Sequence, residues 1–240
     1  MDCPHPQHRA AREEAFGYVC HACSRCCHGK IIQVNPYEVA RLARHLGLST
    51  TEFRAKWTQD GLGTTLARDR QETCVFLGPQ GCTVHPARPL VCRLYPLGRQ
   101  RMPDGNERWL HVEPHPQSEG QYGKAGSIAD FLAAQQAQPY IDAADAYVDW
   151  VNEARTRLPA PGTIPPGSVA PEQASDDVED DDELVDMDKA IACHCAAAGI
   201  AEPPDIEARK DLHLAILYEE LKQAKGGDDD VEQDGGGDRP

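Results

Sequence analysis

The chain of 240 residues carries 39 acidic and 24 basic side chains, giving a formal net charge of −15. Residues 172–190 hold ten acidic groups against one basic group, and residues 226–240 hold six against one, whereas residues 1–158 are nearly neutral. The negative charge that disfavours a nucleic acid partner therefore lies mostly in these two short segments. No run approaches the ~20 apolar residues of a membrane span and no secretory signal is visible, so we expect a cytoplasmic protein that does not contact membranes.

The first element along the chain is a run of closely spaced cysteines, Cys20-x2-Cys23-x2-Cys26-Cys27. Gaps of two residues let successive thiolates turn onto one centre, because tetrahedral zinc with bonds near ~2.3 Å needs sulfurs about 3.8 Å apart. Three thiolates spaced in this way can also cap one face of a cubane iron–sulfur cluster. In a reducing compartment such clustered thiols are metal ligands more often than disulfides. Because neighbouring side chains diverge, we expect Cys26 and Cys27 to play unequal roles.

Helices are predicted on both sides of a loop-rich middle segment. The sequence after Asn35 begins with Pro36, carries Glu38 at the capping-box position, and continues as an apolar stripe that should end at Gly47. A second capping box predicts a helix from Ser49. Residues 60–110 are dense in Gly and Pro and predict loops with at most a small hairpin.

Two further helices are expected after the loops, one from Ser127 and one from Pro139. The second should place Ile141, Ala144, Val148 and Val151 along one packed face.

The same reading divides the chain into four parts. Residues 1–158 should form one cysteine-cluster domain, residues 159–183 a disordered linker rich in Pro and acid, residues 184–225 a helical segment, and residues 226–240 a disordered acidic tail. The expected fold class is mainly α with irregular Cys-rich loops, in a small metal-stabilised domain.

A second group of cysteines, Cys74, Cys82 and Cys92, can close the site that the first motif opens. Alone, each would be read as a small buried apolar residue, but three or four thiolates in the first motif need a distant ligand. His85 follows Cys82 by three residues and is a weaker candidate, because Pro86 beside it indicates a turn.

Two arginines flank the last of these cysteines. Arg88 and Arg93 would offset the negative charge of a centre ligated by thiolates, so both are predicted to contribute to cofactor binding. The predicted metal ligands are Cys20, Cys23, Cys26, Cys27, Cys74, Cys82 and Cys92.

The order of these motifs resembles the YkgJ-type cysteine-cluster family, which is described as a zinc- or iron-chelating domain. The resemblance covers roughly residues 16–135, in which C-x2-C-x2-C-C is followed by NPYEVARLARHLGLS, CVFL and C-x2-H-x2-RP-x2-CR-x-YP. It places all seven predicted ligands on family cysteines. Members commonly carry an eighth cysteine before a Gly-rich segment, where this chain reads EPHPQSEGQYGKAGS. The resemblance therefore leaves His111 or His115 as a substitute, or a site with fewer protein ligands.

The remaining cysteines lack helpful spacing. Cys193 and Cys195 flank His194 in a predicted helix, where residues two apart point in different directions, so a shared metal is awkward. We interpret these residues and Cys3 as incidental to the metal site.

Three functions stay open on the sequence alone. The first is an iron–sulfur protein, with 4Fe-4S the most expected cluster, that acts in electron transfer, sensing or oxidoreduction with an unidentified protein or redox partner. The second is a zinc-stapled interaction module without catalysis. The third follows from a similarity to flagellin lysine methylases, which share a comparable cysteine cluster. Against an enzyme, no Gly-rich cofactor loop follows a strand, and GKAGS at 123–127 is not a P-loop.

Overall fold

The computed structural model describes residues 9–21, 23–59, 63–157 and 184–226. The chain divides into two compact units, residues 1–143 and residues 144–240, and each is treated separately below. The division falls inside helix α5 (Gln138–Arg157), earlier than the predicted boundary at residue 158. The predicted linker and all but the first residue of the predicted tail lie outside the described residues. None of the described helices is long and apolar enough to span a bilayer.

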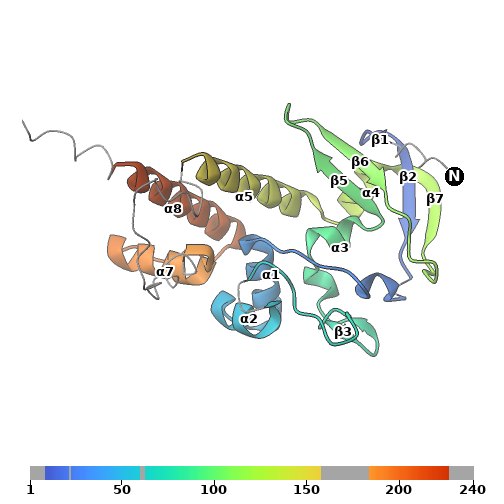
Figure 1. Ribbon diagram of the computed structural model, residues 1–240, viewed down its shortest axis with the longest axis horizontal. Helices are drawn as coiled ribbons and strands as arrows, with labels where there is room; N and C mark the ends of the chain where they lie inside the picture. The colour runs from blue at the N-terminus through green and yellow to red at the C-terminus, as the bar shows by residue number, and fades with distance from the viewer. Residues whose placement is uncertain (1–8, 22, 60–62, 158–183, 227–240) are drawn as a thin grey trace, which may run out of the picture. The chain divides into compact units, whose positions relative to one another are not determined.

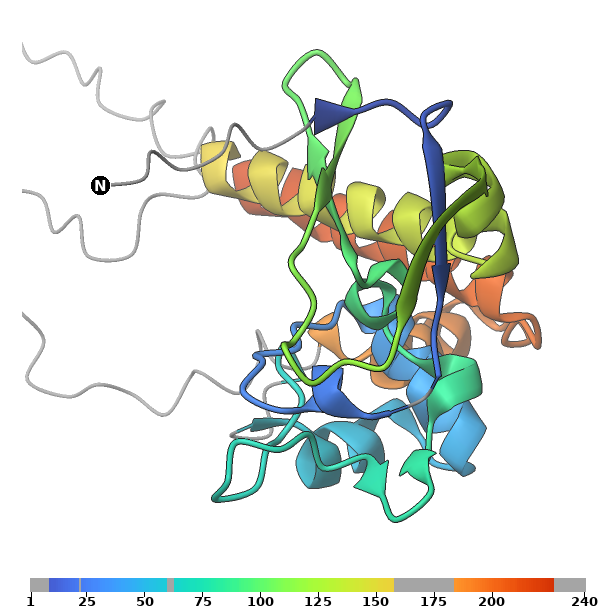
Figure 2. The ribbon, with the colours of Figure 1, turned by 90° about the vertical axis from the view of Figure 1, so that its right-hand side faces the viewer.

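Short antiparallel strands make up much of the first unit (Figures 1 and 2). A three-stranded sheet has the order β1 (Arg9–Ala10), β6 (Glu107–His111), β5 (Leu97–Arg101). A longer pair joins β2 (Ala15–Val19) to β7 (Gln121–Ser127), and a small hairpin joins β3 (Leu77–Gly78) to β4 (Gly81–Cys82). Strands β1 and β2 thus pair the N-terminal segment with strands that follow Cys92, the last predicted ligand.

The prediction of a mainly α fold is confirmed only in part: helices outweigh strands, but the described residues form a mixed α/β structure. The hairpin β3–β4 agrees with the small hairpin expected between residues 60 and 110, but β5 and β6 were missed. Their turn contains Asp104-Gly105, in which Gly105 has φ +81° and donates its N–H to the carbonyl of Met102 at 3.0 Å. Asp-Gly is a strong hairpin signal, since its glycine adopts positive φ without steric cost.

The helices of the first unit confirm the capping boxes read from the sequence. These helices are α1 (Pro36–Leu46), α2 (Thr50–Trp57), α3 (Leu90–Leu94) and α4 (Ile128–Ala134), with the 3-10 turns η1 (Arg25–Cys27) and η3 (His85–Ala87). Capping boxes are present at the starts of α1, α2 and α4, and Gly47 ends α1 with φ +70°. These helix starts were predictable because a capping box is decided within four residues.

Two hydrophobic cores support the first unit. The first core comprises Ala10, Phe16, Leu94, Leu97, Trp109, Ile128, Phe131, Leu132, Ala137 and Ile141. The second core comprises Ile32, Val34, Val39, Leu42, Ala43, Phe53, Leu66, Phe76, Val84 and Ala87. Three of the predicted ligands, Cys74, Cys82 and Cys92, are partly buried against the second core. Packing thus fixes the cysteines of the second group before any metal is considered.

The second unit contains α7 (Met187–Ala198) and α8 (Ile206–Gly226), close to the helices predicted there. His213 on α8 is fully buried, with Nδ1 2.9 Å from the Tyr147 hydroxyl and Nε2 2.7 Å from the carbonyl of Leu184. A carbonyl only accepts hydrogen bonds, so Nε2 carries the proton and the Tyr147 hydroxyl donates to Nδ1. Burial of the ring favours this neutral form, in which Nδ1 is the acceptor.

This histidine should make the second unit less stable in acid. Burial lowers the pKa of His213, although the nearby carboxylates of Asp186 and Asp188 act in the opposite direction. Below the ordinary histidine pKa of about 6.5, the unfolded chain takes up a proton that the folded chain resists, so stability falls as the pH drops toward the folded pKa. We expect amide protection of α8, measured by hydrogen exchange, to fall between pH 7.5 and pH 5.5. The fall should be smaller in His213→Phe and unchanged in His45→Gln, which alters an exposed histidine. An equal fall in His213→Phe would contradict this assignment.

Candidate metal centre

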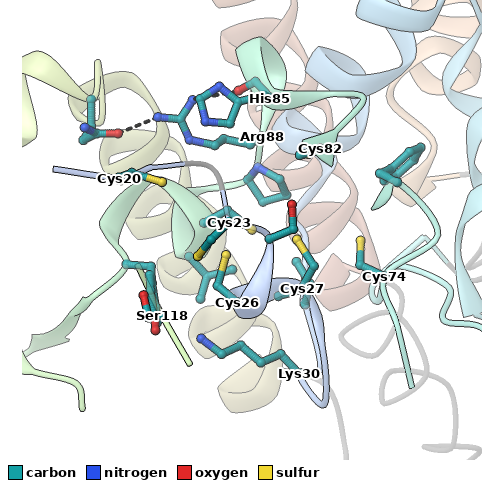
Figure 3. A pocket seen from close by; sticks show the side chains of 18 of the residues that line it. Cys20, Cys23, Cys26, Cys27, Lys30, Cys74, Cys82, His85, Arg88 and Ser118 are labelled. Atoms are coloured by element: carbon teal, nitrogen blue, oxygen red, sulfur yellow. Dashed lines mark hydrogen bonds between the residues drawn. The ribbon is translucent and has the colours of Figure 1, made fainter. Parts of the chain in front are cut away.

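All seven cysteines predicted as ligands line one cavity of about 240 Å³ in the first unit (Figure 3). The first motif occupies the loop after β2 and the turn η1, while Cys74 precedes β3, Cys82 ends β4 and Cys92 lies in α3. The two groups are tied directly, because the N–H of Cys74 donates to the carbonyl of Cys27 at 2.9 Å. The fold thus brings thiols separated by up to about seventy residues to one place.

Within the described part of the chain, no three His, Cys, Asp or Glu side chains are grouped as one metal ion would require. The described cysteines are free thiols. A mononuclear tetrahedral site would need four donors about 3.8 Å apart, whereas ligands of a polynuclear cluster bind different metal atoms and lie further from one another. The donors that line the cavity, seven thiols together with the imidazoles of His21 and His85, suit zinc or iron–sulfur chemistry.

The surroundings of two thiols in the first motif lower their pKa and so favour the thiolate form. A hydrogen bond from the Cys27 thiol lowers the pKa of Cys26 to about 6; burial opposes this, and Lys30 and Arg88 favour it. The same bond raises the pKa of Cys27, which acts as the donor. The N–H of Glu119 lies 3.5 Å from the sulfur of Cys23 and lowers its pKa. Adjacent Cys26 and Cys27 are therefore chemically unequal, and the thiolate form that binds metal is favoured at Cys23 and Cys26.

The thiols of the second group are held in the neutral form. Burial raises the pKa of Cys74 and of Cys82, and it raises the pKa of Cys92 to about 12. A metal ion supplies the charge that deprotonates such a thiol, so binding by these residues would release protons.

Two positively charged side chains line the cavity. Figure 3 shows Lys30 on one side of Cys26 and Arg88 on the other, and both side chains line the cavity. The ammonium of Lys30 lies 3.8 Å from the ring centroid of Tyr95. No Asp or Glu is among the described lining residues, and no carboxylate occurs anywhere in residues 15–37 or 73–103 of this acidic chain. The lack of acidic residues in these two segments was the sequence signal that could have pointed to Lys30.

Arg88 lines the cavity, and Arg93 has a different environment. Arg93 does not line the cavity, and only 4% of its surface is exposed. Its guanidinium donates to the carbonyls of Pro86 (2.6 Å), Arg88 (3.0 Å) and Gln135 (2.8 Å) and to the hydroxyl of Tyr140 (2.8 Å). Arg93 therefore holds the backbone from which Arg88 and Cys92 project.

Glu38 complements Arg93 from the other side of α3. One carboxylate oxygen accepts the N–H of Asn35 at 2.9 Å, and the other accepts the N–H of Leu90 at 2.7 Å. The residue is 4% exposed, and burial raises its pKa to about 7. Glu38 thus caps α1 and fixes the start of α3, the helix that carries Cys92. The cap was visible in the sequence, whereas the bond to the start of α3 was not.

The histidines and remaining cysteines take different positions. His85 lines the cavity, whereas His111 and His115 do not. The N–H of His115 donates to the Tyr95 hydroxyl at 3.0 Å. Cys193 is exposed and Cys195 is buried in α7 of the second unit, and Cys3 lies outside the described residues.

Residues 19–113 match a family whose description reads "CxxCxxCC: Putative zinc- or iron-chelating domain". The matched segment contains all seven cysteines of the cavity together with Lys30, His85, Arg88 and Arg93. Searches of curated proteins and of solved structures found no match.

Proposed function

Because residues 19–113 belong to the CxxCxxCC family of zinc- or iron-chelating domains, we propose that this protein holds an iron–sulfur cluster at the seven-cysteine cavity and has a redox role. The observation that carries the proposal is the convergence of seven thiols from four chain segments on one cavity. The two-residue gaps between Cys20, Cys23 and Cys26 are those of a ferredoxin-like run, which favours a cluster over zinc.

The cysteines divide by role. Cys20, Cys23 and Cys26 supply thiolates from one loop, and at least one of the partly buried cysteines of the second group closes the site. When bound, a cluster of this kind supplies one-electron redox chemistry. The absence of carboxylate from the described lining supports a sulfur-ligated centre over a hard-ion site.

Lys30 and Arg88 supply positive charge beside the proposed centre. A centre ligated by several thiolates keeps a net negative charge, which is costly in a partly buried cavity unless cations lie nearby. Both side chains line the cavity, and both favour the ionised form of Cys26. They would stabilise the assembled centre and raise its reduction potential, since a nearby positive charge favours the more negative, reduced state.

Protein isolated without oxygen is expected to be brown and to contain iron with acid-labile sulfide. The measurements are the visible spectrum and the iron, sulfide and zinc content per chain, with Cys193→Ser as a control that should keep the metal. Colourless protein with stoichiometric zinc and no sulfide would contradict the iron–sulfur proposal and support a zinc-stapled interaction module.

A further inference from the structure

The connection between β6 and β7, residues 112–120, passes next to Cys23 of the first motif. The N–H of Glu119 lies 3.5 Å from the Cys23 sulfur. Ser118 lines the cavity, and Figure 3 shows it beside Cys23. This connection contains no cysteine, so it brings hydrogen-bond donors to the cavity rather than a thiol ligand.

Two tyrosines that line the cavity hold the connection in place. The hydroxyl of Tyr95 accepts the N–H of His115 at 3.0 Å. The hydroxyl of Tyr18 lies 3.2 Å from the hydroxyl of Ser118. Gly120 packs so closely against Tyr18 that a β-carbon at this position would collide with the phenol. The position of the connection relative to the thiols is therefore fixed by the cavity wall.

The surroundings of the Ser118 hydroxyl direct its proton toward Cys23. A serine hydroxyl donates one proton and accepts at two lone pairs. The N–H of Gly120 donates to this oxygen at 3.3 Å, and the Tyr18 hydroxyl is placed to donate to it as well, which leaves the serine proton for the sulfur. The pKa of Cys23 is lowered by the N–H groups of Glu119 and Arg25 against the effect of burial, and the Ser118 hydroxyl lowers it further.

We propose that this connection tunes the metal centre, with Ser118 as a positioning residue whose hydroxyl and the N–H of Glu119 hydrogen-bond the Cys23 sulfur and raise the reduction potential of the bound cluster. The inference rests on the proposed function, which places the cluster at the thiols. Reduction adds one electron to the cluster and so makes its sulfur ligands more negative. Hydrogen bonds to such a sulfur are stronger in the reduced state and therefore favour it.

Direct ligation of the metal by this connection is disfavoured. Glu119 is exposed and is not among the residues that line the cavity. Ser118 offers an oxygen, which metals of thiolate sites bind less readily than sulfur. The connection therefore acts on the centre through Cys23.

The test uses the full chain, purified without oxygen and with its iron and sulfide content measured first. The centre is reduced stepwise with dithionite in the presence of redox mediators, and the visible and EPR spectra give the midpoint potential. Ser118→Ala removes the hydroxyl, so the equilibrium constant for one-electron reduction should fall about threefold or more. The metal content and the thermal unfolding of this variant should stay close to those of the unaltered protein.

Three further variants separate the hydroxyl from its surroundings. Ser118→Thr keeps a hydroxyl and should keep the potential. Gly120→Ala should push the connection away from Tyr18 and from the Cys23 sulfur, and so should also lower the potential. Gln117→Ala is the matched control, because Gln117 belongs to the same connection, is exposed and does not line the cavity. It should leave the potential unchanged.

The outcomes separate the two proposals. An unchanged or higher potential in Ser118→Ala, measured on protein with its full cluster content, overturns the tuning role and leaves the metal proposal intact. An equal fall in Ser118→Thr shows that the hydroxyl is not the cause and overturns it as well. An unchanged potential in Gly120→Ala contradicts the placement of the connection against Cys23. Protein that holds no cluster overturns the proposed function, and this inference falls with it.

Discussion

Replacing Cys23 or Cys26 by serine is expected to release the metal and to unfold the first unit in the same transition. Metal sites can supply ~10–16 kcal/mol of apparent binding free energy, which is comparable with the ~5–15 kcal/mol that stabilises an ordinary domain. Both thiols are favoured as thiolates and line the cavity, so each loss removes a ready ligand. Cys20 should behave similarly, as should at least one of the three partly buried cysteines of the second group.

Other cysteines of the chain serve as controls in the same series. Cys27→Ser should be milder than Cys26→Ser, because Cys27 acts as the hydrogen-bond donor within this pair. Cys193→Ser and Cys195→Ser should leave the metal content unchanged, since both residues lie in α7 of the second unit. The measurement is metal content and thermal unfolding for each single variant. If Cys23→Ser kept as much metal as Cys195→Ser, the assignment of the site would be wrong.

Local features of this chain could be read from its sequence, and long-range ones could not. The capping boxes at Asn35, Ser49 and Ser127 depend on residues three apart, and all three are present. The packed face predicted for α5 included Val148, which is 51% exposed, whereas Tyr140 and Tyr147 are buried. Periodicity alone could not choose between these faces, because aromatic rings and valines satisfy the same spacing.

The same distinction applies to the candidate site. The short gaps of the first motif, visible in one dimension, pointed to four of the thiols that line the cavity; the need for distant ligands and the family resemblance added Cys74, Cys82 and Cys92. Which of the two arginines faces the cavity was not visible. Arg93 is turned away by acceptors 42 and 47 positions further along the chain, at Gln135 and Tyr140, and no local pattern encodes such partners. Pairing of β2 with β7, more than a hundred residues apart in sequence at its widest, was hidden for the same reason.

Arg93→Met is expected to destabilise the first unit by ~3–5 kcal/mol, the usual cost of breaking a buried charged network. Methionine keeps much of the apolar stem, so the lost stability comes from the missing hydrogen bonds. These are the bonds to the carbonyls of Pro86, Arg88 and Gln135 and to the Tyr140 hydroxyl. Arg93→Lys should recover only part of this, because one ammonium cannot reach four separate acceptors in the geometry of a planar fork. The measurement is the free energy of unfolding from chemical denaturation.

The same variant should also weaken metal binding, although Arg93 does not line the cavity. Without its guanidinium, the segment that carries Arg88 and Cys92 loses the bonds that orient it, and misplaced ligands bind metal less tightly. Competition with a chelator should therefore show a lower affinity in Arg93→Met at a temperature where the variant is still folded. Arg70→Met, at an exposed position, should change stability by no more than about 0.5 kcal/mol and leave the affinity unchanged. If Arg93→Met lost stability but bound metal as tightly as the unaltered protein, Arg93 would support the fold without positioning the site.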